Sequence, residues 1–238
     1  SRGGRCLNNC TKGGKYALHS ALQNVLAKAL NGQNLKAVIV EAHPYATEST
    51  RTDISISSAE KPGEILYYVD TTVTNTQQKR IPKLKKLTDA DNIVCCRDLL
   101  LNETVVNNHI FSATANILRK YKGCHDNACE NGNPPSSIVV PFAVDTLGNF
   151  CSVAVIFLKK LAKIKFEKIP GSTEFRDLTA STWVNTTCRD IQTAIIKTCA
   201  YNNRSALKLA FGEEYDKLYP GSIYSPPSYN ENFSSSEG

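Results

Sequence analysis

The sequence predicts an α/β fold in which a mixed β-sheet is flanked by helices and followed by a C-terminal helical extension. Three observations lead to this prediction. Segments rich in β-branched and aromatic residues gather between residues 36 and 75. Segments with apolar residues at helical period lie before and after them. The two kinds of segment alternate along 238 residues, a length that suits one large domain with a core of its own.

The first helix is predicted over Lys15 to Leu30, where alanine, leucine and valine recur on one face at helical period. Asn31 and Gly32 follow, and these residue types are common at helix C-termini because they tolerate positive φ. The next segment, Lys36 to Ala42, reads as a buried strand with Glu41 near its end.

Two more strands are expected in the stretch around which the chain is organised, and a Lys-Pro-Gly-Glu turn joins them. The first runs from Asp53 to Ile56 and the second from Ile65 to Thr74. Because side chains alternate along a strand, Asp70 and Thr72 share one face of the second strand. The opposite face then carries Val69, Thr71 and Val73.

Asp53 and Asp70 are the candidate reactive residues of these two strands. An acid within an apolar strand is costly to bury unless something pairs with it. A divalent cation is one such partner, because hard metal ions take carboxylate oxygens and two acids on adjacent strands can share one ion. The alternatives are that Asp53 caps a turn and that Asp70 pairs with one of the many lysines.

Beyond residue 75 the pattern predicts further helices and strands. A helix is expected over Glu103 to Tyr121, and it ends in basic residues that also suit the helix dipole. A hairpin is expected from strands at Ser137 to Val144 and Phe150 to Phe157. The remaining predictions are helices at 159–168, 187–201 and 205–218, and a disordered tail from 219, where Pro, Ser, Tyr and Asn dominate.

The chain carries a formal net charge of +6, which permits binding to a polyanion without requiring it. A basic run follows the central strands. It is either a solvated face or a contact for a phosphate backbone. Its cationic residues are Lys79, Arg80, Lys83, Lys85 and Lys86.

Cysteine and methionine usage indicates the cellular context. Nine cysteines, an odd number spread through the chain, do not form a compact secreted framework. No run of 18 apolar residues is present, so no membrane span is expected. The absence of methionine, even at position 1, favours a fragment or a processed product. We therefore expect an intracellular location in a reducing compartment.

Cys6, Cys10 and His19 form a candidate zinc set, because Cys-Cys-His at such spacing is part of a zinc knuckle. Residues 1–14 would then be a remnant knuckle or a linker. A fourth ligand is not evident in the sequence, and His19 falls inside the first predicted helix, so the pattern covers only part of a knuckle.

Together these motifs resemble the C-terminal endonuclease domain of early-branching non-LTR retrotransposons, which has the PD-(D/E)XK restriction-endonuclease-like fold. Residues 69–75, VDTTVTN, closely resemble the strand motif of that family. Arg51-Thr52-Asp53 stands where the family has Arg-Pro-Asp, and Leu18-His19-Ser20 stands in place of Arg-His-Asn. Arg119-Lys120-Tyr121 is similar to the family's Lys/Tyr helix.

The resemblance implies a Mg²⁺- or Mn²⁺-dependent DNA endonuclease that nicks target DNA for a retrotransposon polyprotein. Asp53 and Asp70 would hold the metal ion, with Glu41 as a third acid. Thr72 occupies the position where the wider superfamily has its catalytic Lys, and it would contact the water shell of the ion. Lys120 would then supply the cation that stabilises negative charge on the phosphate.

The resemblance also implies DNA as the partner, with element RNA or an upstream reverse transcriptase domain as further partners, and a nuclear location. Arg119 joins the basic run as a candidate nucleic-acid contact. The endonuclease domain would cover residues 15–170, a helical extension 171–218, and the tail 219–238. The alternatives are a catalytically decayed nucleic-acid-binding module of the same fold, and a scaffold domain whose acids pair only with lysines.

Overall fold

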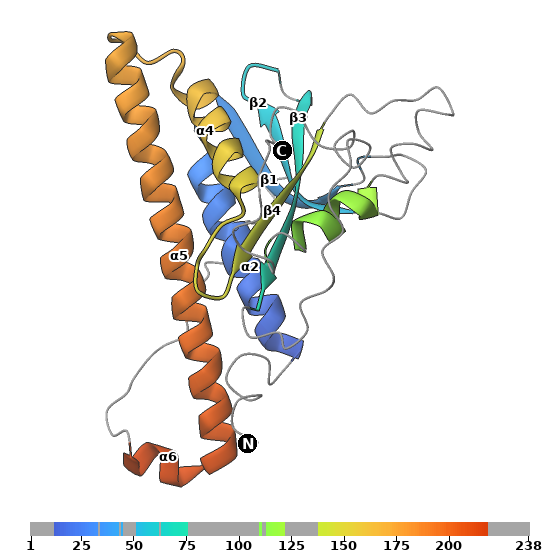
Figure 1. Cartoon of the computed structure of the whole chain (residues 1–238), viewed down its shortest axis with the longest axis vertical. Coiled ribbons are helices and arrows are strands. Elements are labelled where there is room, and N and C mark those ends of the chain that lie inside the picture. Colours follow the sequence, from blue (N-terminus) through green and yellow to red (C-terminus); the bar gives the residue numbers. More distant parts are fainter. Residues whose placement is uncertain are drawn as a thin grey trace, which may run out of the picture.

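The computed structural model describes residues 12–32, 34–42, 44, 51–61, 63–75, 110, 113–121 and 138–218. Within these residues the chain has a mixed α/β architecture with one four-stranded sheet (Figure 1). Its labelled elements follow the order α2, β1, β2, β3, β4, α4, α5 and α6, and residues 113–121 form a further helical stretch. The predicted α/β class with a mixed sheet is confirmed.

The strands lie in the sheet in the order in which they occur in the sequence. The three that precede residue 75 are β1 (Leu35–Ala42), β2 (Thr52–Ser58) and β3 (Ile65–Thr74), each antiparallel to the next. The fourth strand, β4 (Ile138–Asp145), is parallel to β3, so the connection between them crosses over. All four strands match predicted segments to within a few residues.

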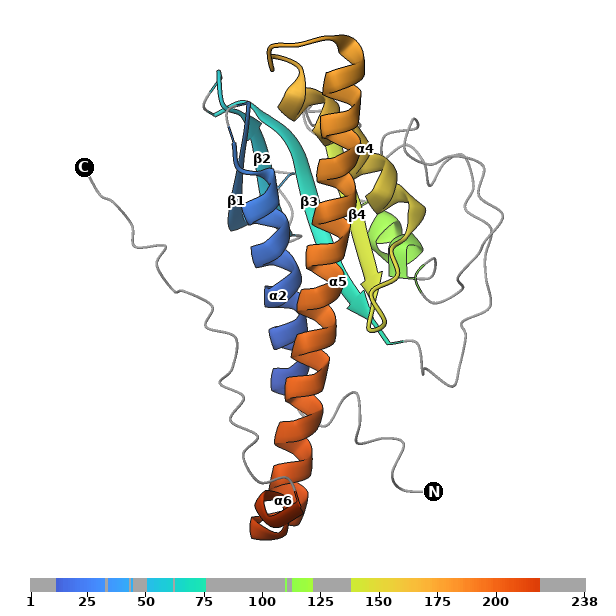
Figure 2. The same ribbon diagram turned by 90° about the vertical axis from the view of Figure 1, so that its left-hand side faces the viewer.

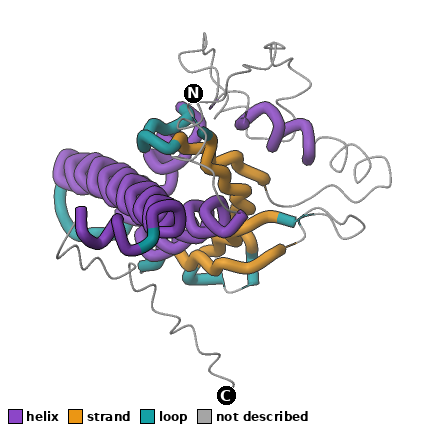
Figure 3. Tube along the Cα trace, turned by 90° about the horizontal axis from the view of Figure 1, so that it is seen from below, coloured by secondary structure: helices purple, strands orange, loops and turns teal. Residues whose placement is uncertain are grey.

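Helices cover both faces of the sheet (Figures 2 and 3). On one face, α2 (Lys12–Leu30) and α4 (Ser152–Phe166) pack on the strands, and α5 (Thr173–Phe211) lies outside them along both helices. The main core gathers apolar side chains from these helices and from the sheet residues that face them, such as Val69. A smaller core on the other face joins the 113–121 helix to the sheet through Ile117, Tyr121, Val139 and Tyr68.

The strand predicted over Phe150 to Phe157 is wrong, because α4 begins at Ser152. This segment is a short continuous apolar run, and such a run does not by itself distinguish a strand from a helix. The side chain of Cys151 caps the helix by accepting a hydrogen bond from the backbone N–H of Ala154. The helical face becomes visible only when the run is read on to Leu161, since the buried residues are Val153, Ala154, Phe157, Leu158, Leu161 and Ala162.

The two closing helices predicted at 187–201 and 205–218 are also corrected. One helix of 39 residues, α5, spans the first of them and most of the second, and the short α6 (Glu213–Leu218) follows. Asparagines occupy positions 202 and 203 between the two predicted helices, and Asn is only mildly unfavourable inside a helix. The break comes instead at Gly212, whose φ of 55° favours glycine.

No helix among the described residues is both long and apolar enough to span a bilayer.

Candidate active site

Asp53 lies where the backbone pairing of β2 with β3 ends. At this position its side chain, and not its backbone, forms the hydrogen bonds to β3. The last aligned pair of the two strands is Ile54 with Val69. One residue further, Oδ2 of Asp53 accepts hydrogen bonds from the backbone N–H of Thr71 at 2.5 Å and from its hydroxyl at 2.8 Å. The Asp53 carboxylate is therefore fixed to the residue that follows Asp70 in β3.

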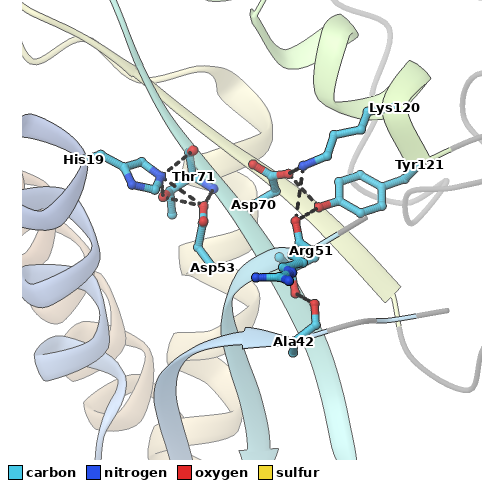
Figure 4. A network of polar contacts seen from close by, with 9 residues as sticks. His19, Ala42, Arg51, Asp53, Asp70, Thr71, Lys120 and Tyr121 are labelled. Atoms are coloured by element: carbon cyan, nitrogen blue, oxygen red, sulfur yellow. Dashed lines mark hydrogen bonds and ion pairs between the residues drawn. The ribbon is translucent and has the colours of Figure 1, made fainter. Parts of the chain in front are cut away.

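His19 approaches this carboxylate from α2 (Figure 4). Its Nε2 lies 3.2 Å from Oδ2 of Asp53. The hydrogen bond that His19 donates to Asp53 raises the pKa of His19 above its usual range, against the opposing effect of burial. For Asp53 itself, burial favours a higher pKa, but the hydrogen bonds from His19 and Thr71 outweigh it and the pKa is lowered. Both shifts favour an imidazolium–carboxylate pair.

Asp70 is 8% exposed and is bound from the other side of β3, by the 113–121 helix. Its Oδ2 accepts hydrogen bonds from Nζ of Lys120 at 2.7 Å and from the hydroxyl of Tyr121 at 2.6 Å. The same two donors reach the carbonyl oxygen of Arg51, at 3.1 and 2.5 Å. Burial raises the pKa of Asp70, the hydrogen bonds from Lys120 and Tyr121 oppose that effect, and the charge of Asp53 adds to it.

Two ion pairs thus lie on neighbouring strands, Asp53 with His19 and Asp70 with Lys120. The charge of Asp53 contributes to the raised pKa of Asp70, so each carboxylate lies within the electrostatic field of the other. Among the described residues, the protein donors of each carboxylate bind Oδ2, and none binds Oδ1. Carboxylate oxygens are ligands that hard divalent cations prefer, but the described residues contain no group of three or more histidine, cysteine or acidic side chains that could hold a metal ion.

Thr71, His19 and Asp53 do not form a nucleophilic relay, although they contain its residue types. A relay needs the hydroxyl on one ring nitrogen and the carboxylate on the other. Here both lie against the same atom, since Nε2 of His19 is 2.9 Å from the Thr71 hydroxyl and 3.2 Å from the Asp53 carboxylate. Thr71 is also only 3% exposed. This cluster is therefore not arranged for a covalent hydrolase.

Of the residues predicted to carry catalysis, the structure brings Lys120 into contact with Asp70, whereas Asp53 is bound by His19 and Thr71 on the other side of β3 (Figure 4). The contact between Lys120 and Asp70 is also what the alternative of a simple lysine–acid pair expects. Thr72 is half-buried, and its hydroxyl makes no hydrogen bond with another described residue. Arg119 is exposed at the same helix end, where its guanidinium binds the side chain of Asn116.

Several predicted residues lie outside what the structure describes. Glu41 belongs to β1, but its side chain is outside the described part. The candidate zinc ligand His19 is placed against Asp53, whereas its two proposed cysteine partners lie outside the described residues. The same holds for the tail at 219–238 and for the basic run, whose members are Lys79, Arg80, Lys83, Lys85 and Lys86.

Sequence reasoning missed the roles of three residues. Tyr121 was noticed only as part of the helix motif, yet its fully buried side chain binds Asp70 directly. Thr71 was assigned to the face opposite Asp70, and that same position lets its hydroxyl meet His19 from α2. Thr52 departs from the Pro of the family motif, and the structure shows that it is buried and that its hydroxyl donates to the carbonyl of Ala42 across β1 and β2.

No protein-family model, curated protein or solved structure matches this chain.

Proposed function

We propose that this protein is a divalent-metal-dependent DNA endonuclease with the restriction-endonuclease-like fold. The observation that carries the proposal is the contact of Lys120 with Asp70, an acid on the strand next to the one that carries Asp53. Lys120 comes from 50 residues beyond Asp70, yet its Nζ lies 2.7 Å from the Asp70 carboxylate. Two acids on adjacent strands beside an accessible cation are the groups that phosphodiester hydrolysis with a metal ion requires.

Each residue has a role that follows from its surroundings. Asp53 is kept ionised by His19 and Thr71, so it is ready to bind a cation. Asp70, on the neighbouring strand, would contribute a second oxygen. When bound, a Mg²⁺ or Mn²⁺ ion would neutralise charge on the scissile phosphate and acidify a bound water. Lys120 is 46% exposed at its side chain, so it can bind a phosphate oxygen that approaches from solvent.

The ion pairs also explain how the site stays charge-balanced in the protein alone. His19 neutralises Asp53, and Lys120 neutralises Asp70. An unpaired buried carboxylate would be costly, so these contacts keep the strand ends folded. Binding of DNA would give Lys120 a second anionic partner.

Mg²⁺-dependent nicking of supercoiled plasmid DNA tests the proposal. Asp70→Asn keeps the shape of the side chain but removes its charge, and we expect nicking to fall by roughly 10²-fold or more. DNA affinity should be unchanged or tighter, because a negative charge facing phosphate is lost. Asp190→Asn, on an exposed position of α5, is the matched control and should nick like the unmodified protein.

Two outcomes would contradict the proposal. If the unmodified protein binds DNA but nicks no faster than Asp70→Asn with either Mg²⁺ or Mn²⁺, the chain is a nucleic-acid-binding module of this fold. If it has no DNA affinity at physiological salt, the scaffold alternative is favoured, and the acids at positions 53 and 70 serve only in ion pairs.

A further inference from the structure

The outer face of α5 carries a stripe of exposed side chains that follows the helix along its length. In Figure 2 this helix runs in front of α2 and α4, and its buried side chains, such as Val184, Ile191 and Ile195, belong to the main core. On the opposite side of the helix, exposed side chains recur every three or four residues, a spacing that keeps them on one face. This outer stripe includes Phe175, Leu178, Thr182, Arg189, Thr193 and Ile196.

The outer stripe is apolar at its two ends and mostly polar between them. At the start of α5, Phe175 and Leu178 are 52% and 67% exposed. Near the end of the helix, Leu207 is half-buried and Phe211 is 55% exposed on the same face. Apolar side chains that are grouped and exposed favour a contact surface over a solvated one. The two apolar ends lie about 54 Å apart along the helix, so a partner that covers both must be about as long as α5 itself.

A second copy of α5 that runs antiparallel to the first covers both ends at once. When Thr193 of the two copies lies at the symmetry axis, Phe175 of one copy stands opposite Phe211 of the other. In the same alignment, to within one residue, Leu178 stands opposite Leu207. The pairing is self-complementary, as a two-fold interface requires, because each contact occurs twice.

Charged side chains fit the same alignment. Asp190 and Lys197 are exposed on one edge of the outer stripe, two helical turns apart. Neither forms an ion pair with another described residue. In a two-fold antiparallel pair, like edges of the two helices meet, so Asp190 of each copy stands opposite Lys197 of the other. The alignment set by the apolar ends therefore also brings two pairs of opposite charges together.

We propose that two copies of this chain form a reversible dimer by antiparallel pairing of their α5 helices, centred on Thr193. The helix has 39 residues, so it is about 58 Å long and about 10 Å wide. The pairing then covers about 1,200 Å² in total, the lower limit for specific and stable interfaces. Together with the polar centre, this area predicts a dissociation constant in the micromolar range. The outer stripe holds none of the residues proposed for the nuclease site, so the inference does not rest on the proposed function.

Sedimentation equilibrium of the full chain, at about 1 to 200 μM, tests the inference. The average mass should rise with concentration from that of one chain, 26.1 kDa, toward that of two. Leu178→Glu should raise the dissociation constant by roughly 10-fold or more, because it places a charge in an apolar contact that occurs twice. The matched control is Leu209→Glu, which should leave the dimer unchanged. Leu209 is 80% exposed on the same helix, but it lies about 220° around the helix axis from Leu178, away from the outer stripe.

A charge exchange tests the alignment. Asp190→Lys should weaken the dimer by roughly threefold or more, because it turns two attractive pairs into repulsive ones. Adding Lys197→Asp to the same chain should restore the affinity. A mass of one chain at every concentration would overturn the inference, and so would a dimer that Leu178→Glu and Leu209→Glu weaken equally. A dimer that Asp190→Lys weakens and Lys197→Asp does not restore would overturn the antiparallel alignment.

Discussion

Removing the hydroxyl of Tyr121 should destabilise the protein by an amount that the structure allows us to work out. Tyr121→Phe keeps the buried ring, so it leaves no cavity. It removes the donor that lies 2.6 Å from Asp70 and 2.5 Å from the carbonyl of Arg51. A hydrogen bond to a charged group contributes about 1.5–3 kcal/mol. Lys120 continues to donate to both acceptors, so we expect the lower end, about 1.5 kcal/mol.

Urea unfolding of the two proteins measures this difference. The midpoint should fall at an unchanged m-value, and the thermal midpoint should drop by about 3–6 °C for a chain of this size. Tyr68→Phe is the matched control, because Tyr68 packs in the same small core and its hydroxyl binds no other described residue. Equal stability of the two variants would refute the reasoning, since the hydroxyl of Tyr121 would then contribute no more than the hydroxyl of Tyr68.

Two further predictions concern the helix that carries His19. The raised pKa of His19 means that its pairing with Asp53 stabilises the fold fully below the unfolded pKa of about 6.5 and progressively less as pH rises through the folded pKa. Because the pair is partly exposed, His19→Gln should lower the free energy of unfolding in urea by less than about 1 kcal/mol near pH 5.5 and by less still near pH 8.5. A loss of stability that grows with pH would contradict this prediction. Lys165 donates to three carbonyls at the C-terminal end of α2, the closest at 2.7 Å. Burial of its ammonium group lowers the pKa of Lys165 and offsets part of the gain from these hydrogen bonds. Lys165→Met should therefore lower the free energy of unfolding by about 1–2 kcal/mol. Lys163 is exposed on α4, the helix that also carries Lys165, and Lys163→Met should have no measurable effect. Equal effects of the two variants would show that the contacts of Lys165 with the end of α2 contribute nothing.

The sequence pattern predicted a strand correctly where the residue types along the segment and the turn residues beside it pointed to the same boundaries. The strand at 65–74 was bounded correctly, because β-branched and aromatic residues fill it and a Pro-Gly turn precedes it. Alternation along that strand also placed Asp70 and Thr71 on opposite faces, as their partners on opposite sides of β3 confirm. Pattern failed at residues 150–157, where a short apolar run suits a strand as well as a helix, and the packing of its face on β4 decides the outcome.

The sequence by itself determined which segments form strands before residue 75, where α2 lies, and which two acids occupy the central strands. Only the tertiary structure decided what those acids touch. Asp53 meets His19 across 34 residues, and Asp70 meets Lys120 and Tyr121 across 50 and 51. Such pairs depend on how helices dock on the two faces of the sheet. Docking is set by the complementarity of whole surfaces, and no spacing along the chain encodes it.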